Sequence, residues 1–416
     1  MERKSDDVTT RGNKLGVWLV GAIGGVGSTV ALGLAALQKR LVDYAGLVSA
    51  LPEFATVPLV NVADIVLGGH EVRSESLVEA VRALHRRANV FDSELITRCT
   101  PILRNMQKNI CPGTLYGVGE IIRTLPDIEM GEVAKDRSAA EAVERLTADL
   151  VAFRKKHQLK NVVVIHVASS EPTVRARRVH GDFAALSKAL GRRGECAIPT
   201  SSLYALAAIE SGCAYVNFTP STGMGIPAIE SLAIERNLPF MGNDGKTGET
   251  LVKSVLAPLF RVRHLDVLSW FGQNILGNRD GAVLRDPVTR ASKIRSKDRT
   301  VARILGKSPA TQVGIDFVPS LDDWKVAWDF IHFRGFLDTR MHMQFIWHGC
   351  DSLLAAPLII DLARFAELEI RAGRGGPMRH LACFFKDPIG ETEYDLFSQW
   401  QRLLEHVKRN SRETSL

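Results

Sequence analysis

The sequence has few cysteines, and they form no recognisable pattern. Six occur among 416 residues, with no CxxC pair and no histidine at a zinc-binding spacing from them. So few thiols in a chain of this size are typical of a reduced protein, rather than of a disulfide framework or a zinc ribbon. The composition therefore predicts a protein of the cytoplasm.

Long apolar runs and blocks of one charge are also missing. The longest apolar stretches, such as residues 352–363, are interrupted by proline and aspartate, whereas a membrane span needs about 18 apolar residues or more. Residues 1–13 are polar and charged, unlike a signal peptide. The 53 Lys and Arg residues outnumber the 46 Asp and Glu residues but form no block of the kind that binds nucleic acid. We therefore expect no membrane and no nucleic acid as partner, while a phosphorylated metabolite agrees with the positive charge.

An α/β pattern fills the first half of the chain. The apolar run 15–20 leads into the glycine-rich turn 21–27 and then into an Ala- and Leu-rich stretch, which is the order strand, turn and helix. A second strand is predicted at 45–50, and the continuous apolar run 161–168 is typical of a strand buried on both faces. We expect a doubly wound α/β fold and, from the length, two or three domains.

The pattern changes after about residue 247. Several of the runs that follow alternate polar and apolar residues, as strands of a sheet with two unlike faces do. These strand-like runs lie at 264–273, 311–318, 329–335 and 341–347. From residue 352 the chain is helical again, so the sequence predicts a second unit within the chain.

The turn Gly21-Ala-Ile-Gly24-Gly25-Val-Gly27 is a candidate phosphate-binding loop. Glycines after a strand let the backbone turn tightly and approach a pyrophosphate at a helix N-terminus. The spacing differs from the commonest G-x-G-x-x-G, so a tight turn without a ligand is the competing interpretation. No ribose-binding acid is clear after the predicted second strand, where Glu53 is the nearest candidate, and local reasoning leaves NAD and NADP open.

Several lysines stand in unusual surroundings. The segment Gly242-Asn-Asp-Gly-Lys-Thr-Gly248 is not a triphosphate loop, because Phe240 stands where that motif requires a glycine; the alternatives are another kind of site and an ordinary turn. Lys293 and Lys297 are four residues apart, which on a helix is usually a solvated surface pair. Lys386 ends an apolar run, where a buried ammonium group would need a partner. Residue types alone do not bring these lysines together.

From Gly16 to about Leu404 the chain resembles the myo-inositol-1-phosphate synthase (inositol-3-phosphate synthase) family, most closely its compact archaeal and bacterial branch. The segments that carry the resemblance occur in family order over nearly the whole length. They are Val17-Trp-Leu-Val-Gly-Ala, Gly68-Gly-His-Glu-Val-Arg73, Val167-Ala-Ser-Ser-Glu-Pro172, Tyr215-Val-Asn-Phe-Thr-Pro-Ser221, Gly242-Asn-Asp-Gly-Lys-Thr-Gly-Glu-Thr-Leu-Val-Lys253, Asn274-Ile-Leu-Gly-Asn-Arg-Asp-Gly281, Ser292-Lys293 with Ser296-Lys297, Asp351-Ser-Leu-Leu-Ala-Ala-Pro357 and Phe384-Phe-Lys-Asp-Pro388.

The resemblance implies a set of site residues. The family's catalytic positions fall on Lys293, Lys297, Lys325, Lys386, Asp244 and Asp351. Its cofactor-binding positions fall on Gly21, Ile23, Gly24, Gly25, Val26, Gly27, Glu71, Ala168, Ser169, Ser170, Asp244 and Asp351. Its substrate-binding positions fall on Asn274, Lys246, Thr247 and Lys253. Glu71 falls where the family places a carboxylate on the NAD ribose, which favours NAD, and Asp244 and Asp351 are the nominated oxygen ligands for a divalent cation.

The activity implied by the resemblance converts D-glucose 6-phosphate to 1D-myo-inositol 3-phosphate. NAD-dependent oxidation at C5 acidifies C6, the resulting enolate attacks the C1 aldehyde in an intramolecular aldol reaction, and C5 is then reduced again. Negative charge develops on oxygen at each step, so fixed cations would lower the barriers. Crowding and burial lower the pKa of a lysine, so one lysine can act as a base while another stays charged.

The fold implied by the resemblance is a Rossmann-type, doubly wound NAD-binding domain with an inserted α+β domain for catalysis and oligomerisation. The first part of the NAD-binding domain would span 1–247, the insert 248–351 and the C-terminal return 352–416, in a homotetramer. Two departures from the family leave the substrate open, because Cys350 replaces a frequent acidic residue and Trp324 crowds the neighbouring lysine. The alternatives are a cyclase of the same fold for a different sugar phosphate, a non-catalytic NAD-binding homologue and a plain dehydrogenase.

Overall fold

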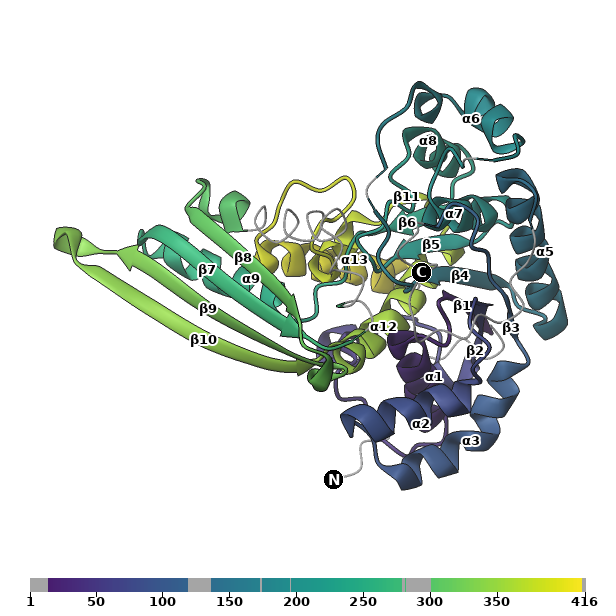
Figure 1. Cartoon of the computed structure of the whole chain (residues 1–416), viewed down its shortest axis with the longest axis horizontal. Coiled ribbons are helices and arrows are strands. Elements are labelled where there is room, and N and C mark those ends of the chain that lie inside the picture. The colour runs from purple at the N-terminus through teal and green to yellow at the C-terminus, as the bar shows by residue number, and fades with distance from the viewer. Residues whose placement is uncertain are drawn as a thin grey trace.

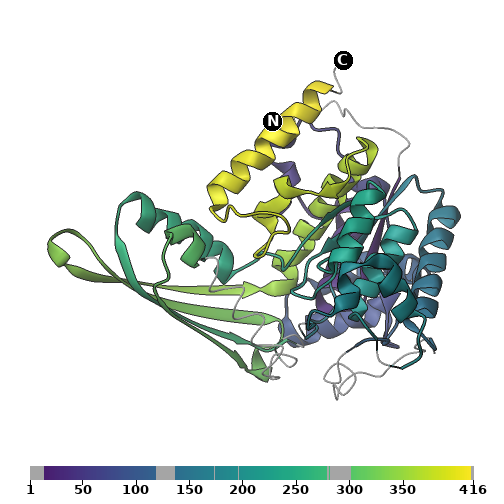
Figure 2. The ribbon, with the colours of Figure 1, turned by 90° about the horizontal axis from the view of Figure 1, so that it is seen from above.

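The computed structural model describes residues 14–118, 136–172, 174–194, 196–278, 281 and 301–413. A parallel sheet of seven strands, with helices around it, forms the body of the molecule. A smaller sheet of four strands projects from one side of this body (Figures 1 and 2).

The seven parallel strands lie in the order β11-β6-β5-β4-β1-β2-β3. They are β1 (Leu15–Val20), β2 (Ile65–Glu71), β3 (Ile110–Pro112), β4 (Asn161–His166), β5 (Ala214–Asn217), β6 (Pro239–Met241) and β11 (Gly376–Pro377). β1, β4 and β5 are apolar and buried on both faces, as central strands of a parallel sheet are. The chain runs outward from β1 to β3 and then returns to β4, so the strand order reverses between β1 and β4.

Helices cover both faces of this sheet (Figure 1). One face packs against α1 (Gly25–Gln38), α2 (Leu77–Ala88), α3 (Ser93–Gln107), α12 (Asp351–Arg371) and α13 (Leu396–Glu413). The other face packs against α5 (Ala139–His157), α6 (Phe183–Leu190), α7 (Thr200–Glu210) and α8 (Pro227–Glu235). The predicted doubly wound fold is thereby confirmed. Within the described part of the chain, no helix combines the length and the apolar character that crossing a lipid bilayer requires.

The strand predicted at 45–50 is wrong. This segment forms turns and a short 3-10 helix, Val48–Ala50, and its backbone groups bind a side chain instead of a neighbouring strand. The amide of Val48 donates to Oδ2 of Asp361 on α12 at 2.6 Å, and the amide of Ser49 donates to the same oxygen at 3.4 Å. The second strand of the sheet is therefore β2, which ends at Glu71.

The projecting sheet has the order β10-β9-β7-β8 and consists of β7 (Asp266–Leu276), β8 (Ala310–Phe317), β9 (Trp324–Arg334) and β10 (Arg340–Cys350). β8 runs parallel to β7, whereas β9 runs antiparallel to both β7 and β10. α9 (Glu249–Val262) covers one face, where Phe260 packs with Trp270 and Ile331. No described helix covers the opposite face (Figure 2).

A buried ion cluster joins α9 to this sheet. Nζ of Lys253 lies 2.6 Å from Oε1 of Glu249 and 3.3 Å from Oδ1 of Asp329, and all three side chains are almost fully buried. Trp270 donates from Nε1 to the same Asp329 oxygen at 2.7 Å. Burial raises the pKa of Asp329 to about 6, an effect that Lys253 opposes. One ammonium group thus makes the burial of two carboxylates tolerable.

Replacing this lysine should destabilise the fold. In Lys253→Met the two carboxylates lose their counter-ion, and we expect the free energy of unfolding to fall by about 3–5 kcal/mol. Lys188→Met, on the exposed side of α6, is the matched control and should change it by less than about 0.5 kcal/mol. Urea titrations followed by circular dichroism measure both values. Equal stability of the two variants would contradict a structural role for Lys253.

Two glycines of α1 should respond in opposite ways to alanine. A Cβ at Gly27 would lie 2.5 Å from the carbonyl oxygen of Gly21 and 2.6 Å from that of Ala22, whereas a Cβ at Gly33 would meet nothing within 4 Å. We expect Gly27→Ala to lower the free energy of unfolding by about 1–3 kcal/mol and Gly33→Ala to raise it by about 0.5–1 kcal/mol. The same urea titration tests both variants. Destabilisation by Gly33→Ala would contradict the prediction, because it would show that α1 does not tolerate an added Cβ even away from the glycine turn.

Candidate functional site

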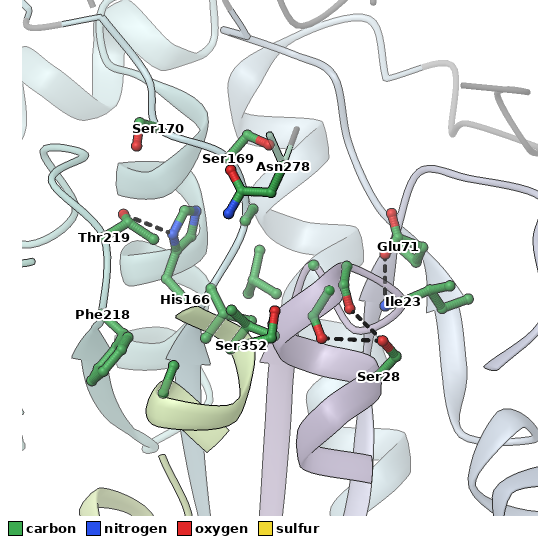
Figure 3. Close-up of a pocket in the computed structure, with 18 of the residues that line it drawn as sticks. Ile23, Ser28, Glu71, His166, Ser169, Ser170, Phe218, Thr219, Asn278 and Ser352 are labelled. Atoms are coloured by element: carbon green, nitrogen blue, oxygen red, sulfur yellow. Dashed lines mark hydrogen bonds between the residues drawn. The ribbon is translucent and has the colours of Figure 1, made fainter. Parts of the chain in front are cut away.

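A cavity of about 330 Å³ opens where the strand order reverses. Its walls come from the carboxyl ends of β1, β2, β4 and β5 and from the first turns of α1 and α12. Figure 3 shows residues from the ends of β2, β4 and β5 and from the first turns of α1 and α12 around one space. Ligands of doubly wound sheets bind at this position, outside the carboxyl ends of the strands.

The glycine turn forms one wall of the cavity. Gly21 has φ +90°, and a Cβ there would lie 2.9 Å from Cα of Ala168, so a side chain would close the gap between β1 and β4. A Cβ at Gly25 would lie 2.9 Å from Oγ of Ser352. The first turn of α1 holds no acidic residue, and Gly24 provides no side-chain cap. The positive end of this helix is therefore available to an anion such as a pyrophosphate.

Glu71 is the last residue of β2 and lines the cavity. Its Oε2 accepts the amide of Ile23 in the glycine turn at 2.8 Å, and Oε1 accepts the amide of Val72 at 2.8 Å (Figure 3). The guanidinium group of Arg73 lies 3.3 Å from Oε2. An acid at the end of the second strand is the position that binds the ribose of NAD in doubly wound folds. The acid that was not found after the segment 45–50 is thus Glu71, the last residue of the true second strand β2.

Two distant segments pair and bring a carboxylate and an ammonium group together. The backbones of Asn243 and Asp387 exchange two hydrogen bonds, of 2.8 and 3.2 Å, and the amide of Lys386 donates to the carbonyl of Asp244 at 2.7 Å. Nζ of Lys386 lies 2.8 Å from Oδ1 of Asp244, and both side chains are buried. Asp244 has φ +62°, and its buried Oδ2 has no hydrogen-bond partner among the described residues. Both side chains line the cavity.

A second ammonium–carboxylate pair lies where the projecting sheet meets the body. Lys325 on β9 pairs with Gly349 on β10, and its Nζ lies 3.5 Å from Oδ2 of Asp351, the first residue of α12. Asp323 stabilises this junction. Its carboxylate accepts one hydrogen bond from Oγ of Ser352, at 3.0 Å, and another from the amide of Ser352, at 3.3 Å. Asp351 and Asp323 line the cavity, whereas Lys325 is not among the lining residues.

The other residues implied by the resemblance divide into three groups. Further cavity-lining residues among them are Ile23, Val26, Ala168, Ser169, Ser170 and Thr247. The lining does not include Gly27, Lys246, Asn274 or Lys253. Lys293 and Lys297 lie outside the described residues.

The three polar residues that do not line the cavity, Lys246, Asn274 and Lys253, interact with other residues of the chain. Nζ of Lys246 donates to Oε1 of Gln399 on α13 at 3.1 Å, and burial lowers the pKa of this lysine to about 8. Asn274 is fully buried in β7, where Nδ2 is 3.5 Å from the carbonyl oxygen of Gly314. Lys253 belongs to the ion cluster under α9. Their substrate-binding roles stay predictions.

The two residues that depart from the family lie outside the cavity walls. Trp324 donates from Nε1 to the carbonyl of Ala88, the last residue of α2, at 2.8 Å. Sγ of Cys350 donates to Oδ2 of Asp323 at 2.8 Å. Neither side chain lines the cavity, and the effect of Trp324 on the neighbouring Lys325 stays a prediction.

Many polar residues of the cavity were not predicted from the sequence as site residues, among them His166, Thr219, Asp323 and Ser352. His166 ends a run that is predicted as a buried strand. Only its position beside the glycine turn in the folded structure shows that it lines the cavity. Asp323 and Ser352 adjoin two nominated residues, Lys325 and Asp351, and that proximity was the available signal. Thr219 lies in the segment 215–221, which carries part of the family resemblance.

Comparisons with known proteins agree with this architecture. The family described as myo-inositol-1-phosphate synthase matches residues 15–409. The chain is 32% identical to inositol-3-phosphate synthase 1 of Bacteroides thetaiotaomicron over 95% of each chain. The structure of inositol-3-phosphate synthase from Caenorhabditis elegans aligns with a TM-score of 0.85 at 24% identity, covering 96% of this chain and 86% of that one. The structure of a myo-inositol-1-phosphate synthase-related protein from Thermotoga maritima aligns with a TM-score of 0.75 at 23% identity, covering 95% of this chain and 99% of that one.

The two solved structures share the fold, and the sequence matches extend from β1 into α13. A match of this length includes the glycine turn, both ammonium–carboxylate pairs and the projecting sheet. The chain belongs to the myo-inositol-1-phosphate synthase family.

Proposed function

We propose that the protein is an inositol-3-phosphate synthase, which converts D-glucose 6-phosphate to 1D-myo-inositol 3-phosphate with bound NAD and without net redox change. The bacterial relative bears the name of this activity and is similar over 95% of both chains. The observation that carries the proposal is the buried Lys386–Asp244 pair in the same cavity as the glycine turn. One enclosed space for oxidation, ring closure and reduction keeps reactive intermediates from escaping into water.

The residues around the cavity fit NAD. The glycine turn and the positive end of α1 suit the pyrophosphate, and Glu71 suits the ribose hydroxyls. Side chains at Gly21 and Gly25 would fill the space that a dinucleotide needs. When bound, NAD supplies the acceptor for the C5 hydride and the donor for the final reduction.

We assign Lys386 to the C1 oxygen of the substrate. Its Nζ would give a proton to that oxygen as the bond between C1 and C6 forms, while Asp244 holds the ammonium group in place. Lys325, paired with Asp351, would stabilise charge on the C5 oxygen together with Lys293. Lys297 would hold the phosphate. The roles of Lys293 and Lys297 rest on the family resemblance.

A divalent cation is compatible with the site. Oδ2 of Asp244, which has no hydrogen-bond partner in the described part of the chain, is the kind of hard oxygen ligand that such a cation prefers, and Asp351 lines the same cavity. These two carboxylates would hold the cation, which would add to the stabilisation of negative oxygen atoms. The roles assigned to the lysines do not depend on it.

The open face of the projecting sheet supports a homotetramer. It carries Phe271, Trp328 and Phe330 at the centre of the sheet and Ile346 on the edge strand β10, and Ile346 is 66% exposed. Apolar faces of this kind mark contacts between proteins. In this proposal the insert 248–351 carries the subunit contacts, between the two parts 1–247 and 352–416 of the NAD-binding domain.

The thiols support a cytoplasmic location as part of the same proposal. All six cysteines are free, and burial raises the pKa of those at 99, 213, 350 and 383. A high pKa keeps a thiol protonated and slow to react. Free, unreactive thiols suit a reducing compartment.

The activity is tested with purified protein, catalytic NAD, a magnesium salt and glucose 6-phosphate, followed by phosphorus and proton NMR. Inositol monophosphate without net NADH is the expected product. Conversion of another sugar phosphate in its place would favour the same-fold cyclase, and net accumulation of NADH would indicate a dehydrogenase.

The role of Lys386 predicts a selective loss of ring closure. In Lys386→Gln we expect kcat to fall by a factor of about 100 or more, the usual effect of losing a group that stabilises a developing oxyanion. The Kd for NAD, from calorimetry, should change by less than about threefold, because Lys386 is assigned to the sugar. Lys188→Gln is the matched control and should keep wild-type activity. A Lys386→Gln enzyme with unchanged kcat would refute the assignment.

The proposed subunit contact predicts a change in mass. Ile346→Glu places a charge in the open apolar face, and we expect light scattering after size exclusion to show a species smaller than the wild-type tetramer. Lys188→Glu, on the exposed side of α6, should leave the mass unchanged. If Ile346→Glu remains a tetramer, the subunit contact does not depend on the open face of the projecting sheet.

A further inference from the structure

His166 presents a hydrogen-bond acceptor to the cavity, a feature that the proposed mechanism does not use. The residue ends β4, pairs in register with Val20 of β1 and lines the cavity. Val20 directly precedes the glycine turn, so the imidazole stands beside the place where a dinucleotide crosses the sheet. Figure 3 shows the ring among the cavity residues, with one nitrogen joined to Thr219.

The surrounding hydrogen bonds fix the orientation of the Asn217 amide. Nδ2 of Asn217 donates to the carbonyl of Ser221 at 2.6 Å and to Oδ1 of Asn243 at 2.8 Å. Oδ1 of Asn217 accepts the amide of Thr219 at 3.1 Å. A backbone amide can only donate, so the oxygen of Asn217 faces Thr219.

This orientation determines which ring nitrogen of His166 carries the proton. Oγ1 of Thr219 donates its proton to Oδ1 of Asn217 at 2.8 Å and accepts the amide of Ser221 at 3.2 Å. Nδ1 of His166 lies 3.3 Å from the same hydroxyl oxygen. The hydroxyl proton is already committed, so Nδ1 must be the donor in this contact, and Nε2 carries the lone pair.

The imidazole is also neutral. Burial lowers the pKa of His166 to about 3, so the ring carries no charge near neutral pH. Nε2 has no hydrogen-bond partner among the described residues. A neutral acceptor suits a neighbour that brings N–H or O–H donors and, in oxidised NAD, a positively charged ring that a protonated histidine would repel.

We propose that Nε2 of His166 accepts a hydrogen bond from the bound dinucleotide, either from a ribose hydroxyl or from the carboxamide N–H of the nicotinamide. This inference rests on the proposed use of NAD. It makes His166 a cofactor-binding residue, with Thr219 and Asn217 as the residues that hold its proton on the other nitrogen.

Binding measurements on the full-length protein test the proposal. His166→Phe keeps a ring of similar shape without an acceptor, and we expect its Kd for NAD, from calorimetry, to rise about threefold to tenfold, the worth of one neutral hydrogen bond. His166→Gln can place an amide oxygen near the position of Nε2 and should recover most of the affinity. Unfolding temperatures and circular dichroism of all variants check that the fold is kept.

A second pair of variants tests how the proton is placed. Thr219→Val removes the acceptor for Nδ1 and frees the tautomer, so it should weaken NAD binding less than His166→Phe does. In His166→Phe the ring has no nitrogen, so Thr219 can no longer fix a tautomer. The double variant His166→Phe/Thr219→Val should therefore lose no more affinity for NAD than His166→Phe alone. Losses that add in full would contradict the tautomer argument.

Three ligands separate the possible donors. ADP-ribose lacks the nicotinamide but keeps a ribose, so a parallel loss of its affinity in His166→Phe would identify a ribose hydroxyl. A loss confined to NAD would identify the carboxamide, and either result supports the proposal. Unchanged NAD affinity in a folded His166→Phe protein, or a loss confined to glucose 6-phosphate, would overturn it. A wild-type protein that binds no NAD would instead contradict the proposed function.

Discussion

A carboxylate beside a buried ammonium group stabilises its charge, and three junctions of the structure depend on such pairs. Lys386 with Asp244 joins two segments of the body. Lys325 with Asp351 joins the projecting sheet to α12, and the Lys253 cluster joins α9 to that sheet. The interactions that hold these parts together are therefore of the same kind as those that would supply charge to a substrate.

What separates a structural lysine from a candidate catalytic one is whether its ion pair lines the cavity. Two carboxylates surround Lys253, and Trp270 occupies one of their oxygens inside a sealed interface. Asp244, by contrast, lines the cavity together with its lysine. A charge inside a sealed interface stabilises the fold, whereas one that lines a cavity can also interact with a ligand.

Local patterns predicted the elements around the cavity well, because strand, turn and helix follow from short-range physics. The run 161–168 and the glycine turn 21–27 identified two of its walls, and the doubly wound fold followed from them. The segment 45–50 misled the strand assignment, because its amides bind Asp361, a residue more than three hundred positions away. With that strand misplaced, Glu71 could be recognised only through the family resemblance.

Contacts between distant residues were beyond any local argument. Asp244 and Lys386 are 142 positions apart, so no spacing rule connects them. Glu249 and Lys253 have the spacing of a surface pair on a helix, yet the apolar side of α9 carries them into the interface. From the sequence, His166 looked like one more member of a buried strand. Its tautomer depends on Asn217, which ends the neighbouring strand β5, and on Thr219, which follows it.

The pairing of Asn243 and Asp244 with Lys386 and Asp387 also sets the order in which the protein can mature. During synthesis the glycine turn, β1 and β4 leave the ribosome well before Lys386 does, and N-terminal parts of a chain generally fold first. β11 then adds to the edge of the seven-stranded sheet, and the backbone of residues 386–387 forms its hydrogen bonds with Asn243 and Asp244. A nascent chain could thus form the glycine turn and the central strands early but would gain α12 and the ammonium group for ring closure only late in translation.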